Sequence, residues 1–283
     1  MKRVVLLCCA AIFCLSFASC TKEDISDLDK VEDVCEKIDD YQFKKYVIEN
    51  FDTDKNGKLS MSEAAAATIM YAGEKDIQSL AGIEYFTNLS VLKCYKNQLT
   101  SLDVSKNINL TELQCAYNKL TSLDVSKNVK LKELYCYDNY DLTTITLGDN
   151  SSLEVLNCAY TDLSKLDISK NVNLVTLDVF NTDLTELDVT KNVNLVKLDC
   201  ANTILADNSN VKRLTKLDVS NNAKLEILYC NNNLLTELNV SKNLNLVELE
   251  CEKNPLVTVY LNKKHKNVLK SEIPDGAKVE YLD

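Results

Sequence analysis

A segment of roughly 21 residues recurs along most of the chain, and this repeat restricts the possible folds more than any other feature. Each copy carries a leucine at an equivalent position, and successive leucines are separated by 21, 21, 22, 21, 21, 30 and 21 residues. A fixed period in this range is typical of a solenoid, in which each coil buries its apolar residues against the next. The equivalent leucines are Leu92, Leu113, Leu134, Leu156, Leu177, Leu198, Leu228 and Leu249.

The apolar residues within one copy predict two short strands. The segment from Glu112 to Ala116 alternates polar and apolar residues, which is the period of a half-buried strand. Leu99, Leu102 and Val104 form a second apolar group, followed by a turn-forming Ser-Lys-Asn sequence. Because one copy has too few apolar side chains for a core of its own, stacked copies must share one. We therefore predict a β-rich solenoid with a parallel sheet over residues 67–256.

The one long repeat contains an insertion of nine positions between Leu205 and Leu214. Its composition, beginning Ala206-Asp-Asn-Ser-Asn, is rich in residues that favour turns. We expect the insertion to loop out of the stack without interrupting it.

One copy written in full, Leu110-x-x-Leu113-x-Cys115-x-x-Asn118-x-Leu120, resembles the leucine-rich repeat family. The short period and the strand cysteine are similar to those of the internalin-like bacterial class. This resemblance covers about two thirds of the chain and implies a leucine-rich repeat array with a curved parallel sheet and no enzymatic activity. It does not identify a ligand.

The N-terminal segment has the composition of a targeting signal. Lys2 and Arg3 precede an apolar run that is short for a membrane span, and the run ends in small residues before Cys20. This pattern resembles a bacterial lipoprotein signal, which implies a signal peptide over residues 1–19 and acylation of Cys20. The alternative is an ordinary secretory signal cleaved near the same point.

The segment that follows Cys20 is charged and rich in aspartate, which predicts a flexible tether over residues 20–39. The sequence Thr21-Lys22-Glu23-Asp24 resembles the acidic segment that sends some lipoproteins to the outer cell surface. The resemblance therefore implies a bacterial outer-membrane protein that contacts the membrane only through its lipid and is exposed at the surface.

An EF-hand-like motif follows the predicted tether. Apolar residues at helical spacing predict a helix from Asp40 to Phe51, and the next twelve residues fit the calcium-loop pattern D-x-[DN]-x-[DN]-G-x₅-E at every position. Gly57 permits the sharp turn of such a loop. The predicted ligands are the side chains of Asp52, Asp54 and Asn56, the carbonyl of Lys58, Ser60 through water, and bidentate Glu63.

We interpret residues 40–66 as a helix-loop-helix that caps the first coil and holds one structural Ca²⁺ ion. Terminal coils of a solenoid need such a cap, because their apolar edge is otherwise exposed. The alternative is a turn that has the EF-hand sequence but binds no ion, since the usual second loop is missing. Residues 257–283 are predicted to form the C-terminal cap.

Seven cysteines occupy one equivalent position in successive copies, where Val179 and Ala72 also occur. Exchange with small apolar residues indicates buried, reduced thiols rather than disulfides or a metal site. The cysteines are Cys94, Cys115, Cys136, Cys158, Cys200, Cys230 and Cys251.

The chain offers little for catalysis or for nucleic-acid binding. His265 is the one histidine, and its basic neighbours Lys263, Lys264 and Lys266 favour an exposed loop. No glycine-rich phosphate loop is present, so we do not expect an enzyme. The formal net charge of −10 makes a nucleic-acid partner improbable.

Aromatic residues at the outward strand positions and just beyond the strands indicate a binding face. Tyrosine is favoured at binding hot spots, although it also suits exposed strand positions in general. We expect a protein partner first and a glycan second, bound by a monomer; the competing class is a structural spacer or display scaffold. The candidate residues are Tyr95, Tyr117, Tyr135, Tyr137, Tyr160 and Phe180.

Overall fold

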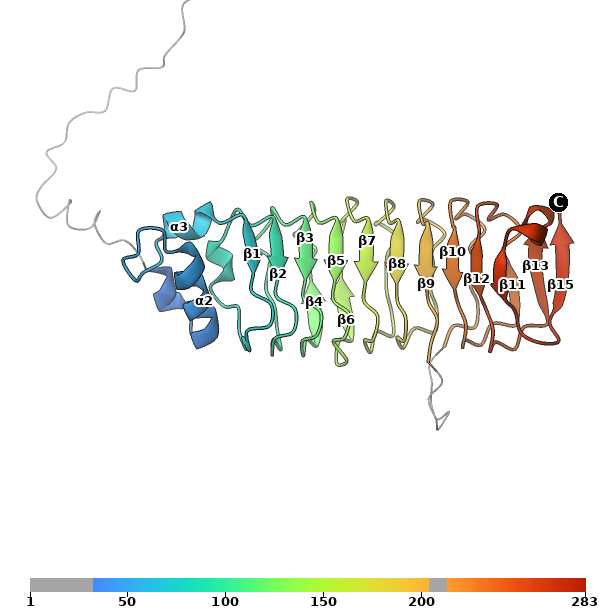
Figure 1. The fold of residues 1–283 in the computed structure, drawn as a ribbon, viewed down its shortest axis with the longest axis horizontal. Helices are drawn as coiled ribbons and strands as arrows, with labels where there is room; N and C mark the ends of the chain where they lie inside the picture. The colour runs from blue at the N-terminus through green and yellow to red at the C-terminus, as the bar shows by residue number, and fades with distance from the viewer. Residues whose placement is uncertain (1–32, 204–212) are drawn as a thin grey trace, which may run out of the picture. The chain divides into compact units, whose positions relative to one another are not determined.

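The computed structural model describes residues 33–203 and 213–283, and these residues form a parallel β-solenoid (Figure 1). Cys20 and the predicted signal and tether up to residue 32 lie outside the described residues. The main sheet has ten strands within the described part of the chain. In spatial order they are β1 (Ile69–Tyr71), β2 (Val91–Lys93), β3 (Glu112–Gln114), β5 (Glu133–Tyr135), β7 (Val155–Asn157), β8 (Thr176–Asp178), β9 (Lys197–Asp199), β10 (Ile227–Tyr229), β12 (Glu248–Glu250) and β14 (Lys270–Glu272).

The repeat leucines are in register across this sheet. Met70 pairs with Leu92, Leu92 with Leu113, and the same pairing continues coil by coil to Leu249. In β2, as in most strands of the sheet, the central residue is buried and its two neighbours are half-buried. The predicted stack is therefore confirmed. It also continues across the insertion, because Leu198 of β9 pairs directly with Leu228 of β10.

The opposite side of the solenoid has fewer strands than the main sheet in the described residues, in the region of the predicted Leu-x-x-Leu-x-Val group. Leu123 and Val125 of one such coil are buried, and their counterparts in other coils pack against the same continuous core. These elements are β4 (Ser122–Asp124) with β6 (Thr144–Thr146), and β11 (Glu237–Asn239) with β13 (Thr258–Asn262) and β15 (Lys278–Leu282).

The strand cysteines are buried and unpaired in the structure, which confirms their packing role. Burial raises the pKa of the Cys115 thiol to about 12, and burial likewise raises the pKa of Cys94. Because the thiolate is the reactive form, these groups are chemically inert at neutral pH.

Two rows of buried asparagines follow the coils and satisfy the backbone where the chain turns. In the first row, Asn118 accepts a hydrogen bond from the Leu99 amide and donates to the carbonyls of Cys94 and Cys115. Thr161 and Thr182 take this position in two coils. In the second row, each asparagine from Asn128 onward donates to a carbonyl of the preceding coils. Its members are Asn107, Asn128, Asn150, Asn171, Asn192, Asn222 and Asn243.

His265 ends this second row, so the expectation of an exposed histidine is wrong. The side chain is only 2% exposed. Its Nδ1 accepts from the Asn262 amide at 3.2 Å, so Nε2 carries the proton and donates to the Asn243 carbonyl at 3.0 Å. The imidazole thus replaces the next asparagine, while Lys263, Lys264 and Lys266 remain exposed around it.

Replacing His265 by alanine should lower the free energy of unfolding by about 2 kcal/mol, because a buried carbonyl and a buried amide both lose a partner. The matched control is Lys264→Ala, which removes an exposed neighbouring side chain and should have little effect. Denaturant unfolding of both variants measures the difference. Equal stabilities would show that His265 does not close the row.

The helices cover the first coil, as the sequence predicts (Figure 1). Helix α2 (Tyr41–Phe51) is capped by Asp40, whose second carboxylate oxygen accepts from the Gln78 and Ser79 amides of the first coils. Phe43 and Phe51 pack against Phe86, which follows η2 (Ile83–Tyr85). The remaining cap elements are α3 (Met61–Ala66) and η1 (Val34–Lys37). The predicted tether over residues 20–39 is therefore wrong from residue 33 onward, because Val34 and Ile38 are buried in the core.

The C-terminal segment does more than cover the last coil. Residues 257–283 add β14 to the main sheet and both β13 and β15 to the opposite side, joined through η3 (Lys263–Asn267). Sequence patterning missed β14 because all three of its residues are exposed and give no apolar alternation. Across residues 33–203 and 213–283, no helix has the length and apolar character required to cross a bilayer.

Candidate interaction face and candidate calcium loop

The outward side chains of the main sheet form rows, because every strand is parallel and in register with the next. The row two positions beyond each strand alternates small and aromatic residues: Gly73, Tyr95, Ala116, Tyr137, Ala159, Phe180 and Ala201. At one end of the row, the Tyr95 ring lies over Gly73, where an added Cβ would come within 2.9 Å of the ring. The small residues therefore leave room for neighbouring aromatic rings.

The first predicted aromatic residues gather around a shallow hollow on this face. The hollow has a volume of about 430 Å³. The Tyr117 and Tyr137 rings meet edge to face with their centroids 5.3 Å apart, and the Lys96 ammonium lies 5.9 Å from the Tyr117 ring. The lining residues are Tyr95, Lys96, Gln114, Ala116, Tyr117, Tyr135 and Tyr137.

The remaining two predicted residues, Tyr160 and Phe180, form a second pair of the same kind. Their rings meet edge to face with centroids 5.1 Å apart. Tyr160 follows β7 as Tyr117 follows β3, and Phe180 follows β8 as Tyr137 follows β5, so the second pair repeats the first two coils further along. We call the six predicted residues the aromatic face: Tyr95, Tyr117, Tyr135, Tyr137, Tyr160 and Phe180.

Tyr117 and Tyr160 are held in the left-handed backbone region, with φ of 54° at both residues. Bulky residues rarely adopt this conformation, which costs about 1–3 kcal/mol for a non-glycine residue. The turn has positive φ in other coils too, so what distinguishes Tyr117 and Tyr160 is an aromatic side chain at this position. The other residues found there are Glu74, Lys96, Asp138, Asn181, Asn232 and Lys253, and asparagine and aspartate tolerate the conformation. Sequence reasoning missed this strain, although aligning the copies places a tyrosine where other copies have polar or charged residues. Strain of this kind tends to persist at ligand-binding surfaces.

Replacing Tyr117 by asparagine should leave the free energy of unfolding within about 0.5 kcal/mol of the wild-type value. Relief of the backbone strain offsets loss of the ring contact with Tyr137, which is worth about 0.5–1.5 kcal/mol. The matched variant Tyr117→Val loses the same contact but keeps a side chain unsuited to positive φ, so it should be clearly less stable. Denaturant unfolding compares the two, and equal losses would contradict the strain argument.

Carboxylates near the aromatic face affect the tyrosine hydroxyls. Burial and the hydrogen bond from its hydroxyl to Glu133, 3.0 Å long, raise the pKa of Tyr135 to about 12. The charge of Asp138 raises the pKa of Tyr117. Both tyrosines are therefore neutral hydrogen-bonding groups at physiological pH.

Beyond the aromatic face, the same sheet surface becomes acidic. Asp178 and Asp199 are register partners on β8 and β9, and Glu250 and Glu272 are register partners on β12 and β14. We call these four residues the acidic row. Burial and the nearby Asp178 charge raise the pKa of Asp199 to about 6, and burial also raises that of Asp178. Burial and the Glu272 charge raise the pKa of Glu250.

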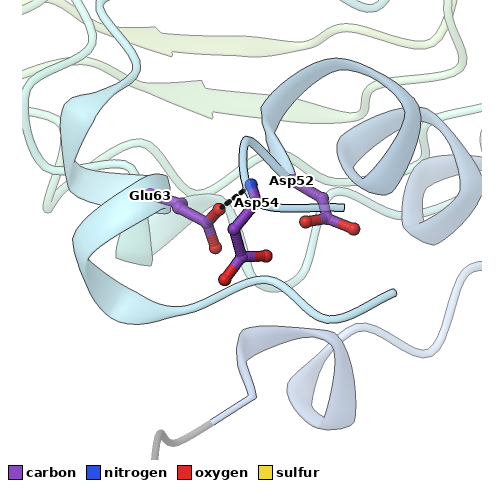
Figure 2. Close-up of side chains that lie close together, drawn as sticks. All are labelled: Asp52, Asp54 and Glu63. Carbon is purple, nitrogen blue, oxygen red and sulfur yellow. Dashed lines mark hydrogen bonds between the residues drawn. The ribbon is translucent and has the colours of Figure 1, made fainter. Parts of the chain in front are cut away.

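The predicted calcium loop brings three of its carboxylates together between α2 and α3 (Figure 2). Ligand oxygens of Asp52, Asp54 and Glu63 lie within 4.8 Å of one another. Asp52 accepts from the amides of Asn56 and Gly57, and this folds the loop around the carboxylates. The backbone at Gly57 has a φ of 79°, which explains the glycine.

The other predicted ligands also lie in this loop. The Asn56 side chain donates to Asp54 and accepts from the Lys58 amide. Ser60 caps α3 in a capping box with Glu63. Burial opposes ionisation of Glu63, but hydrogen bonds from the Ser60 amide and the Thr53 hydroxyl outweigh it and lower its pKa to about 2. The loop thus presents a set of oxygen donors, which suits a hard cation such as Ca²⁺.

Comparison with known structures finds leucine-rich repeat proteins. The functional domain of InlJ from Listeria monocytogenes, which includes a cysteine ladder, is 28% identical over 89% of this chain, with a TM-score of 0.60. The alignment covers 63% of that domain, so this chain spans less than two thirds of its length. Seven cysteines of this chain likewise occupy equivalent positions in successive strands or just beyond them.

Two further structures share the fold at lower identity. Internalin C2 from Listeria monocytogenes is 17% identical, with 85% of this chain and 95% of that chain covered and a TM-score of 0.52. The leucine-rich repeat domain of APL1B is 18% identical, with 75% and 62% covered and a TM-score of 0.59. No protein-family model matches the sequence, and no curated protein matches it. The repeat, the parallel solenoid and these structural neighbours together show that the chain has the fold of leucine-rich repeat proteins.

Proposed function

We propose that this chain is a non-enzymatic cell-surface lipoprotein whose aromatic face binds a protein partner. The observation that carries the proposal is the strained placement of Tyr117 and Tyr160, because the fold does not need an aromatic residue at positive φ. The edge-to-face pairs and the hollow beside them add the exposed aromatic area that interface hot spots favour. Leucine-rich repeat neighbours support the same role.

Replacing Tyr95, Tyr135 and Tyr137 by serine tests the proposal. A binding screen on the full chain first supplies the partner, and the triple variant should then lose more than about 2 kcal/mol of affinity per dominant residue. Tyr41→Ser is the matched control, because Tyr41 is an exposed tyrosine on α2, outside the aromatic face. Unchanged affinity in a folded triple variant would favour the spacer or display role. A glycan as the captured partner would support the second ligand class.

We propose that the loop from Asp52 to Glu63 holds one structural Ca²⁺ ion. Asp52, Asp54, Asn56 and Glu63 would supply side-chain oxygens, Lys58 its carbonyl, and Ser60 a water-mediated contact. The ion would join the end of α2 to the start of α3 and so stabilise the cap over the first coil.

The lipid anchor is a separate part of the proposal, because Cys20 lies outside the described residues. In a bacterial host, a fatty-acid probe should label the wild-type chain, and Cys20→Ala should abolish the label and release the protein from the membrane fraction. Cys35→Ala is the matched control. Because Cys35 is buried in η1 and should not be labelled itself, this variant should keep the label of the wild-type chain. Persistent labelling of the Cys20→Ala variant would contradict lipoprotein processing.

A further inference from the structure

The aromatic face and the acidic row lie on one continuous surface. The third residues of the strands form one row along the main sheet, which starts at Tyr71, Lys93 and Gln114. It continues through Tyr135 on β5 and Asn157 on β7 and reaches Asp178 and Asp199 on β8 and β9. The same row then reaches Glu250 and Glu272. A ligand laid along the array would therefore meet aromatic rings at one end and carboxylates at the other.

The carboxylates of the acidic row outnumber the cations around them in the part of the chain that the structure describes. Glu248 pairs with Lys270 at 3.0 Å and Glu252 with Lys253 at 3.5 Å, but no ion pair within 4.0 Å reaches any of the four acidic-row members. The Lys197 charge acts on Asp178 and Asp199, and its ammonium lies 5.6 Å from the centroid of the Tyr229 ring. Lys270, which pairs with Glu248, also acts on Glu250. Five carboxylates against two lysines leave this part of the face with an excess of negative charge.

The spacing of the aromatic pairs restricts the shape of the ligand. The Tyr117–Tyr137 and Tyr160–Phe180 pairs are separated by two strand steps, or about 9.6 Å for neighbouring strands 4.8 Å apart. A polyproline II helix completes one turn in three residues, or about 9.3 Å, and proline-rich segments dock on aromatic-lined surfaces. Successive turns of such a helix therefore match successive aromatic pairs.

Hydrogen-bonding groups on the face suit the same ligand. The aromatic face carries the hydroxyls of Tyr95, Tyr137 and Tyr160, and a phenolic hydroxyl can donate a hydrogen bond. A polyproline II backbone has no internal hydrogen bonds, and its carbonyls project outward. The strands from β2 to β12 are each paired on both sides within the sheet, so this part of the face offers side chains rather than a free strand edge to a ligand.

We propose that the face binds an extended, proline-rich peptide segment bearing lysine or arginine, with its proline turns on the aromatic pairs and its cations over the acidic row. This inference rests on the proposed function and specifies its partner. Charge complementarity selects the basic segment, and the pair spacing selects its conformation. From β2 to β14 the sheet spans eight strand steps, or about 38 Å, which about 12 residues of polyproline II would cover.

Synthetic peptides of this length provide the test, with calorimetry on the full chain. The first has lysine after every two prolines, the second replaces lysine by glutamine, and the third replaces proline by alternating glycine and serine. We expect the first to bind, and the other two to bind at least tenfold more weakly. Added salt should weaken binding of the first peptide, because the salt ions screen the attraction between its lysines and the acidic row. No binding of the first peptide would overturn the inference.

Matched variants locate the binding site. The double variant Tyr117→Asn with Tyr160→Asn keeps residues suited to positive φ. The double variant Asp199→Asn with Glu250→Gln removes charge at nearly constant size. Each double variant should weaken binding of the first peptide at least tenfold. The control is Asp188→Asn, an exposed carboxylate outside the main sheet. Equal affinity for all variants would overturn the inference, as would binding of a neutral oligosaccharide in place of the peptides. If a captured partner still depends on the tyrosines while the lysine–proline peptide does not bind, the inference fails and the proposed function stands.

Discussion

Replacing Asn139 by alanine should lower the free energy of unfolding by about 3 kcal/mol or more. This fully buried side chain accepts from the Leu120 amide at 3.0 Å and donates to the Cys136 carbonyl at 2.9 Å and to the Cys115 carbonyl at 3.1 Å. Cys115 keeps Asn118 as a donor, but the Leu120 amide and the Cys136 carbonyl lose their side-chain partner. Each unsatisfied buried group costs about 1–3 kcal/mol.

The matched control for Asn139→Ala is Asn139→Thr. The next coil carries Thr161 at this position, where its hydroxyl donates to the Cys158 carbonyl at 2.8 Å. Threonine at position 139 should therefore recover the bond to Cys136 and lose less stability than alanine. Urea unfolding with a common m-value measures both variants. Equal losses would show that the row contributes packing rather than hydrogen bonds.

The periodic part of the fold could be predicted from the sequence because its physics repeats in every coil. The central leucines pair in register from Leu92 to Leu249, and the strand cysteines are buried. Both follow from period-2 alternation within a coil and the fixed period between coils. The insertion before Leu214 does not break the register, since turn-forming residues lie outside the apolar pattern.

Features that depend on contacts between coils could not be predicted. His265 is buried because its partner carbonyl belongs to Asn243 in the preceding coil. Its lysine neighbours indicate an exposed loop in the sequence, so the burial could not be predicted. β14 has no apolar residue to indicate its place in the sheet. The positive φ of Tyr117 conflicts with the preference of tyrosine, so only the polar residues at the same position in other copies point to it.

The calcium loop and the aromatic face also differ in how much of them the sequence could predict. The calcium loop is a local motif, and the hydrogen bonds from Asn56 and Gly57 to Asp52 form within six residues. The pairing of Tyr160 with Phe180 instead depends on the distance between coils. Sequence spacing indicated that these residues share a face, but not that their rings repeat at two-coil intervals.

Calcium should raise the stability of the full chain, and Glu63→Ala should abolish uptake of the ion. An ion that binds only the folded cap stabilises it by about 2.7 kcal/mol at a hundredfold excess over Kd. Calorimetry should show one site, and thermal unfolding should move to higher temperature with added calcium. The matched control is Glu49→Ala, an exposed carboxylate on α2 outside the loop. Absence of both heat and a melting shift would leave a turn that binds no ion.

The pH dependence of the cap provides a second measurement of the same loop without calcium. The pKa of Glu63 is lowered from 4.5 to about 2 in the folded protein. A carboxyl whose folded pKa is depressed stabilises the protein above its unfolded pKa, and this contribution is lost as the pH falls toward the folded value. Wild type should therefore lose more stability than Glu63→Gln between about pH 4.5 and pH 2. Parallel pH profiles for the two proteins would show that the bonds from Ser60 and Thr53 to Glu63 do not hold the loop in solution.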